Sequence, residues 1–173
     1  MADTGILSGT SSSGNAIIGS NAWFELAGNV GWLTNQTCTV IGFSPDIPTG
    51  STIVGAIVHL TNTYALTTPS VLDIQLSIDG GSNFSDAIST GNLTTTASDD
   101  VEVGDSSELW GLDWSDFKGA NISDIQIKGT STAAGVPLSA MAQIQIYYED
   151  AVLHTTSIVS GKLILKSGKL TIK

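Results

Sequence analysis

The chain has 173 residues, enough for one domain with a substantial core, and it carries 16 acidic and 6 basic side chains. The charge is segregated: the body through Gly161 has 2 lysines against 16 acids, a net charge of −14, and the last twelve residues carry the other four lysines. A body this negative repels phosphate, so nucleic-acid binding is not expected, and no apolar run is long enough to enter and cross a membrane.

The N-terminal segment and the rest of the chain differ in composition. Residues 1–21 are rich in Gly, Ser, Thr and Asn and bury too little apolar surface to offset chain entropy, which predicts a flexible N-terminal arm. From Trp23 onward, short apolar runs alternate with Gly, Pro, Asn and Asp, as is typical of strands and turns. Residues 22–150 are therefore predicted to form one all-β domain, an antiparallel β-sandwich with a jelly roll as its leading architecture.

Several strands are predicted from short segments in chain order. "TCTVIGF" holds the only cysteine, Cys38, which is expected to pack as a small hydrophobe. After the turn "IPTG", the run "STIVGAIVHLTNTY" has apolar residues at both odd and even positions. This pattern is expected of a central strand covered on both faces or of a strand beneath a loop. "VLDIQLSIDGG" alternates apolar and polar residues and ends in a "DGG" turn, and "NLTTT", "DDVEV" and "LWGLDW" are predicted to follow as strands.

Two later segments show the same alternation. The isoleucines of "SDIQIKG" are predicted to face inward, as are the isoleucines and the second tyrosine of "QIQIYYED". The single helical candidate is one turn near "WSDFKGAN", capped by Ser115 and ended by Gly119.

Few side chains carry a chemical signal. His59 and His154 lie on different segments without a cysteine or carboxylate at metal-ligand spacing, so a buried or interface histidine is favoured over a zinc ligand. No G-x-S-x-G turn supports a serine nucleophile. Catalytic carboxylate pairs can come from distant parts of a sequence, so a polysaccharide-active enzyme remains an alternative. The oxygen-rich segments "SDDVEVGD" and "DGGSNFSD" would also suit calcium binding, although solvated turns explain both segments. The expectation is a protein that is not an enzyme and has no metal or cofactor.

Two tryptophans lie four residues apart in "ELWGLDWSDF". Trp110 and Trp114 would suit a sugar-stacking platform, because aromatic faces bind carbohydrate well. In a strand, however, residues four apart share a face, and with Leu109 and Leu112 nearby the pattern favours the closed end of a core.

The C-terminal segment, 151–173, is a basic amphipathic tail that repeats "SGKLILK" as "SGKLTIK". A hairpin turning at Ser167 and Gly168 would oppose Leu165 to Leu170 and place all four lysines on the other face. Such a hairpin is marginal alone, so it is predicted to need a partner surface, either the acidic body of a neighbouring copy or another acidic protein. A frayed, solubilising tail is the alternative. The predicted assembly interface comprises Lys162, Leu163, Leu165, Lys166, Lys169, Leu170, Ile172 and Lys173.

The order of four segments resembles a β-sandwich domain of structural proteins from tailed bacteriophages: "IPTGSTIVGAIVHL", "LDIQLSIDGGSNFSDA", "VGDSSELWGLDWSDFKGANISDIQIKG" and "AQIQIYYED", over roughly Val30 to Asp150. In that family a "WG..W" corner is architectural. The resemblance therefore implies that Trp110, Gly111 and Trp114 hold the fold, and it implies no catalytic residues. Little sequence precedes or follows the domain here, which weakens any claim to a long tail fibre.

These features lead to the expectation of a phage virion protein, most specifically a capsid decoration (cement) protein. Made in the host cytoplasm, it would bind the outer surface of the head as a homotrimer, with the major capsid protein or another virion protein as its partner. Small size, a single sandwich and an adhesive ribbon suit a protein that attaches to a lattice. The alternative is a receptor- or glycan-binding module of a tail fibre or spike, in which exposed tryptophans would matter.

Overall fold

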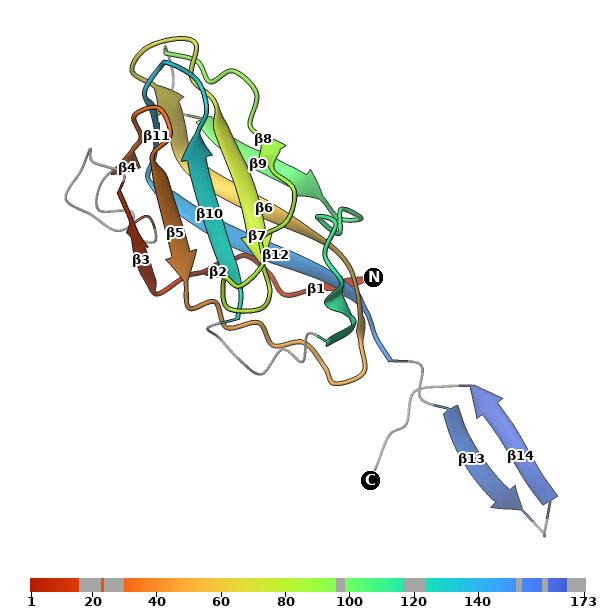
Figure 1. Cartoon of the computed structure of the whole chain (residues 1–173). Helices are drawn as coiled ribbons and strands as arrows, with labels where there is room; N and C mark the ends of the chain where they lie inside the picture. Colours follow the sequence, from red (N-terminus) through yellow and green to blue (C-terminus); the bar gives the residue numbers. More distant parts are fainter. Residues whose placement is uncertain are drawn as a thin grey trace.

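The structure is a computed structural model, and it describes residues 1–15, 23, 30–95, 99–116 and 124–151, together with the course of the backbone over 154–159 and 162–167. About 49% of the chain lies in strands. Within the described ranges the one helical element is η1, a 3-10 turn at Trp114–Asp116. Each strand pairing in these ranges is antiparallel, so the prediction of an all-β antiparallel fold is confirmed (Figure 1).

The larger sheet has seven strands: β1 (Ala2–Asp3), β2 (Leu7–Ser8), β4 (Val30–Gly31), β6 (Thr52–Ala65), β9 (Asp99–Asp105), β11 (Pro137–Ser139) and β12 (Met141–Glu149). Its central strand is β6, which pairs with β12 on one side and with β9 on the other. β11 pairs with the C-terminal end of β6 and with β4, and the short strands β1 and β2 both pair with β12. Among the described strands, β9 therefore ends one side of this sheet.

The smaller sheet has five strands: β3 (Ser11–Gly14), β5 (Thr37–Ile41), β7 (Leu72–Ser77), β8 (Ile88–Ser89) and β10 (Gln126–Ser131). Their order across the sheet is β3-β5-β10-β7-β8, with β10 at the centre between β5 and β7. The chain crosses repeatedly between the two sheets, which face each other across the core (Figure 1).

One apolar core lies between the two sheets. The inward positions predicted in "SDIQIKG" and "QIQIYYED" are buried, and so are those of "VLDIQLSIDGG" except the half-buried Ile78 at its end. β6 is the expected central strand: Val58 and Leu60 on its inner face are fully buried, whereas its outer face is half-buried. Cys38 is a buried free cysteine, as predicted, and burial raises the pKa of its thiol to about 11.

Tryptophan fills much of the core. Trp23 and Trp32 are both fully buried and meet edge to face, with ring centroids 4.9 Å apart. The ring of Trp23 lies against Gly129 on β10, where an added Cβ would stand only 2.4 Å from the indole. Glycine in mid-strand weakens a strand in general, and here it makes room for the ring.

The first fifteen residues are not a free arm, which differs from the prediction for residues 1–21; residues 16–21 lie outside the described residues. β1 and β2 pair with β12, and β3 pairs with β5, so this segment adds strands to both sheets. The prediction counted only side-chain burial, whereas a Gly- and Ser-rich strand is held through its backbone. Small residues help here, because a Cβ on Gly9 would lie 2.4 Å from Val40.

Two predicted strands do not form among the described residues, which include 92–95 of "NLTTT" and all of "LWGLDW". Residues 92–95 of "NLTTT" form a loop in which Leu93 is buried. The Leu93 amide donates to the Ser70 carbonyl, and the Thr94 carbonyl accepts from the Ala65 amide. In "LWGLDW" both Trp110 and Gly111 have positive φ values, 60° and 66°, which break a strand into a tight turn.

The C-terminal tail contains a hairpin that was not predicted, whereas the second strand of the predicted hairpin lies outside the described residues. β13 (His154–Val159) and β14 (Lys162–Ser167) form a separate two-stranded sheet, beyond the end of the sandwich in Figure 1. In this hairpin Leu165 pairs with Thr156, and Val159 pairs with Lys162 on either side of the first "SG" of the repeat. The predicted pairing of Leu165 with Leu170 falls on residues outside the described ones. Both repeats begin with the same turn dipeptide, and the β-branched run "TTSIV" before the first supplies a strand that the prediction overlooked.

Candidate functional site

The predicted tryptophan corner lies at the turn that follows β9. Trp110 is 2% exposed, and its indole Nε1–H donates to the Ala56 carbonyl on β6 at 2.9 Å. Its backbone amide donates to a Glu108 carboxylate oxygen at 2.7 Å. These two bonds hold a residue with an unfavourable left-handed backbone in place, so the indole ties the turn to the central strand.

Trp114 begins η1 and is 6% exposed, with its Nε1–H donating to the Leu109 carbonyl at 3.0 Å. A carboxylate oxygen of Asp113 accepts the Ser115 amide hydrogen at 3.0 Å and caps this turn. The amides that Ser115 was predicted to cap, from residue 117 onward, lie outside the described residues. Hydrogen bonds from the side chain and then the backbone of Ser115 lower the pKa of Asp113. The predicted end of the turn, Gly119, lies outside the described residues.

A cavity of about 500 Å³ borders this corner. Leu109, which is 41% exposed, stands at its wall, and both tryptophans of the corner are buried. The prediction that Trp110 and Trp114 belong to the core is therefore confirmed, and neither presents the open ring face that sugar stacking requires. The cavity is lined by Gly50, Ser51, Thr52, Ile53, Leu109, Leu112, Asp113, Trp114 and Ser115.

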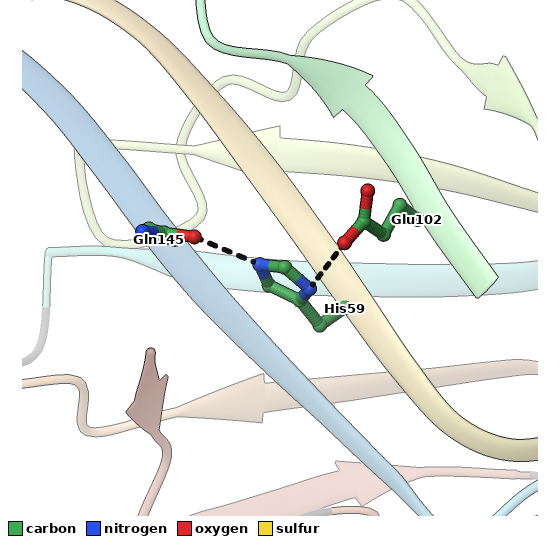
Figure 2. Close-up of polar contacts among 3 residues, drawn as sticks. All are labelled: His59, Glu102 and Gln145. Atoms are coloured by element: carbon green, nitrogen blue, oxygen red, sulfur yellow. Dashed lines mark hydrogen bonds and ion pairs between the residues drawn. The ribbon is translucent and has the colours of Figure 1, made fainter. Parts of the chain in front are cut away.

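A polar group on the outer face of the larger sheet was not predicted. Figure 2 shows the imidazole of His59 on β6 between Glu102 on β9 and Gln145 on β12. Its Nδ1 is 3.4 Å from a Glu102 carboxylate oxygen and its Nε2 is 3.3 Å from Gln145 Oε1. The His59 side chain is only 13% exposed, whereas that of Glu102 is 65% exposed. The group thus links three adjacent strands across the sheet surface.

The protonation state of His59 decides how this group is bonded. An imidazolium donates to both oxygens as they stand. A neutral ring donates to Glu102 through Nδ1, and Gln145 must then turn its amide nitrogen toward Nε2. Either arrangement satisfies a half-buried ring. The prediction of a buried or interface histidine therefore fits the geometry, with one carboxylate brought to it by strand pairing.

A cleft of about 500 Å³ opens beside this group. The outer-face position of His59 could have been predicted from the alternation in "IVHLT", because its neighbours Val58 and Leu60 point inward. The pairing of β6 with β9 could not be deduced from either segment alone. The cleft is lined by Ile6, His59, Thr61, Asp100, Val101, Glu102 and Gln143.

The oxygen-rich loop "DGGSNFSD" is organised by hydrogen bonds to Asp79. Its carboxylate accepts the Asn83 amide hydrogen at 2.9 Å, the Asn83 side-chain amide at 2.7 Å and the Ser77 hydroxyl at 2.7 Å. These bonds, led by the Asn83 backbone amide, lower the pKa of Asp79 to about 2. Within the described residues, no three His, Cys, Asp or Glu side chains are grouped so that they could hold a metal ion.

The predicted assembly interface falls partly within the hairpin. Lys162, Leu163, Leu165 and Lys166 lie on β14, and β14 pairs only with β13 among the described strands. The other predicted members, Lys169, Leu170, Ile172 and Lys173, lie outside the described residues.

No protein-family model matches the chain, and no curated protein sequence matches it. In the described part of the chain, no helix has the length and apolar character needed to span a bilayer.

Proposed function

We propose that the chain is a non-enzymatic structural protein of a tailed-bacteriophage virion, and within that class a capsid decoration protein bound to the outside of the head. The observation that carries the proposal is the division of the chain into an acidic β-sandwich and a separate β-ribbon. The ribbon lies in the segment that holds four of the six lysines. A compact body with a separate, oppositely charged ribbon suits attachment to a repeating surface.

The strand order supports a finer description of the fold as a jelly roll. Count β1 with β2 as the first strand and then β5, β6, β7, β8, β9, β10 and β12 as the second to eighth. The larger sheet then reads first, eighth, third, sixth, and the smaller sheet reads second, seventh, fourth, fifth. This is the order that two nested Greek keys produce, and jelly rolls are common in viral shells. The link from fold to shell is an analogy at the level of the fold.

The alternative, a glycan- or receptor-binding module of a fibre or spike, depends on exposed aromatic rings. Trp110 and Trp114 were the candidates for such rings, and both are buried. Their burial favours the architectural role and with it the decoration protein.

The direct test uses heads of the phage that carries the gene, prepared without this protein. We expect the purified chain to bind them saturably and to appear by cryo-electron microscopy as regularly spaced density on the outer surface, with three copies per site. Density confined to the tail would favour the fibre alternative. Absence of the chain from purified virions would refute both assignments.

The part played by the tail is tested on the same heads. Exchanging Lys162, Lys166, Lys169 and Lys173 for glutamine should weaken attachment modestly, because exposed ion pairs contribute about 1 kcal/mol or less each. Leu163→Asp combined with Leu165→Asp should abolish attachment, because apolar burial contributes roughly 25 cal/mol per Å² and would be lost. Equal binding by all these variants would leave the tail a solubilising end only.

A further inference from the structure

The larger sheet has an open edge at β9. This strand pairs with β6 on one side, and no described strand pairs with its other side. Other strands at the margins of the two sheets, β1, β2, β3, β4 and β8, have two to four residues, whereas β9 has seven. A long unpaired edge presents a row of backbone donors and acceptors that can add another strand. β9 is therefore the described edge best able to receive one.

The charge around this edge has one sign. Residues 99–116 contain seven acids and no basic residue. On β9 itself Val103 is buried toward the core, while Asp100 and Glu102 are exposed. Carboxylates along the edge discourage β9 of one copy from pairing with β9 of another, because like charges directly opposite each other destabilise a strand pair. A strand that carries lysine does not meet this repulsion.

Such a strand exists in the same chain. β14 has six residues, reads "KLILKS", and is itself an edge strand of the two-stranded ribbon. Lysines at 162 and 166 alternate in sequence with leucines at 163 and 165, which matches the alternation of carboxylates with valines on β9.

We propose that β14 of one copy adds antiparallel to the free edge of β9 in a second copy and extends its larger sheet. With position 166 opposite Asp100, position 165 falls opposite Val101 and position 163 opposite Val103. Glu102 is then flanked diagonally by both lysine positions, within reach of long side chains. The second copy is the occupant because the ribbon lies beyond the end of its own sandwich, away from its own β9 (Figure 1). This inference rests on the proposed role as an assembling virion protein.

The contact joins two different surfaces, a ribbon and an edge, so it is head to tail. Head-to-tail contacts close into rings when the rotation between copies permits. A ring of three such contacts yields the proposed trimer and leaves no β9 edge open. Because the ribbon supplies backbone hydrogen bonds as well as charge, the contact is specific without a large apolar patch on either body.

Disulfide trapping between full-length chains tests the proposed register. Opposite residues in an antiparallel pair have Cα atoms about 4.5–5.5 Å apart, within the range that a disulfide spans. Asp100→Cys and Lys166→Cys chains are mixed under mild oxidation, with the buried Cys38 left in place. We expect a mixed cross-linked dimer. Asp86→Cys, which places the thiol on an exposed residue of the loop between β7 and β8 rather than on β9, is the matched control and should give less than about a tenth of that product.

Charge exchange provides a second measurement. Asp100→Lys with Glu102→Lys should weaken self-association about tenfold, and adding Lys162→Glu with Lys166→Glu to the same chain should restore it. Circular dichroism checks that each variant keeps its fold. Equal trapping at positions 86 and 100, or the absence of a mixed cross-linked dimer, overturns the inference. Head binding without a cross-link at position 100 would leave the proposed function standing, whereas a cross-link without head binding would leave only the inference.

Discussion

Replacing Trp110 with phenylalanine tests whether the indole holds the turn after β9. The Nε1–H of Trp110 donates to the Ala56 carbonyl at 2.9 Å, and the side chain is buried. Phenylalanine removes this donor, and losing a buried hydrogen-bond partner costs about 1–3 kcal/mol. The missing ring atoms leave a small void that adds about 1 kcal/mol. We therefore expect the free energy of unfolding to fall by about 2–4 kcal/mol.

Urea unfolding, followed by the fluorescence of the other three tryptophans, measures this loss. With a slope of about 1–3 kcal/mol/M, the midpoint should move down by roughly 1–2 M. Trp114→Phe is the matched control, because its Nε1–H also donates to a carbonyl, that of Leu109, at a more exposed place. It should cost about 1–2 kcal/mol. A loss below about 0.5 kcal/mol for Trp110→Phe would refute the role of the indole.

The neighbouring Gly104 allows a double-mutant cycle at the same corner. Its φ is 87°, and a Cβ there would lie 2.7 Å from the Ala56 carbonyl oxygen and 2.9 Å from the Trp110 ring. Gly104→Ala should therefore destabilise the protein strongly. The penalty should shrink by about 1 kcal/mol in the Trp110→Phe background, because the ring atoms nearest the new methyl group are gone. Strict additivity of the two changes would show that the ring does not press on β9.

Three further predictions concern other parts of the molecule. Gly129→Ala should lower the free energy of unfolding by about 1–3 kcal/mol, because the methyl group overlaps the buried Trp23 ring, and thermal unfolding measures it. Asp79 should keep its loop hydrogen bonds as the pH falls below 3.8, its ordinary pKa, and lose them only as the pH approaches about 2; an NMR titration of the Asn83 amide with a midpoint near 3.8 would contradict this. Truncation after Asp150 should leave a folded body that assembles poorly, and sedimentation that matches the full chain would rule out an assembly role for the tail.

The period-two segments of the sequence predicted their strands well. Burial in an antiparallel sheet with one wet face imposes the alternation directly, so "QIQIYYED" alone reveals which residues of β12 face the core. The single cysteine and the two tryptophans of the corner were likewise placed inside from their neighbours. These are local properties, and each can be read within one segment.

The features that sequence reasoning missed depend on partners or on backbone geometry. Strands β1 to β3 are held by pairing with β12 and β5, and the composition of a Gly- and Ser-rich segment does not predict such pairing. The turn at Trp110 requires a left-handed tryptophan, a conformation that is rare outside glycine and asparagine. His59 and Glu102 meet only because β6 pairs with β9 in one register. Strand β13 was missed because the prediction built its hairpin from the two copies of the tail repeat alone.

In the proposed assembly, the acidic edge of β9 would have two roles. Before assembly, the carboxylates of Asp100 and Glu102 would keep the β9 edge of one copy from pairing with the β9 edge of another, as charged edges do in other sheets. In the proposed contact, the same carboxylates would attract the lysine-bearing ribbon over about a Debye length, roughly 8 Å at physiological salt. Salt should therefore slow the association of copies more than it speeds their separation, because charge guides the encounter whereas backbone pairing and apolar burial hold the docked strand. Stopped-flow mixing at low and high salt separates the two rates, and an effect confined to dissociation would mean that charge holds the strand rather than steering it.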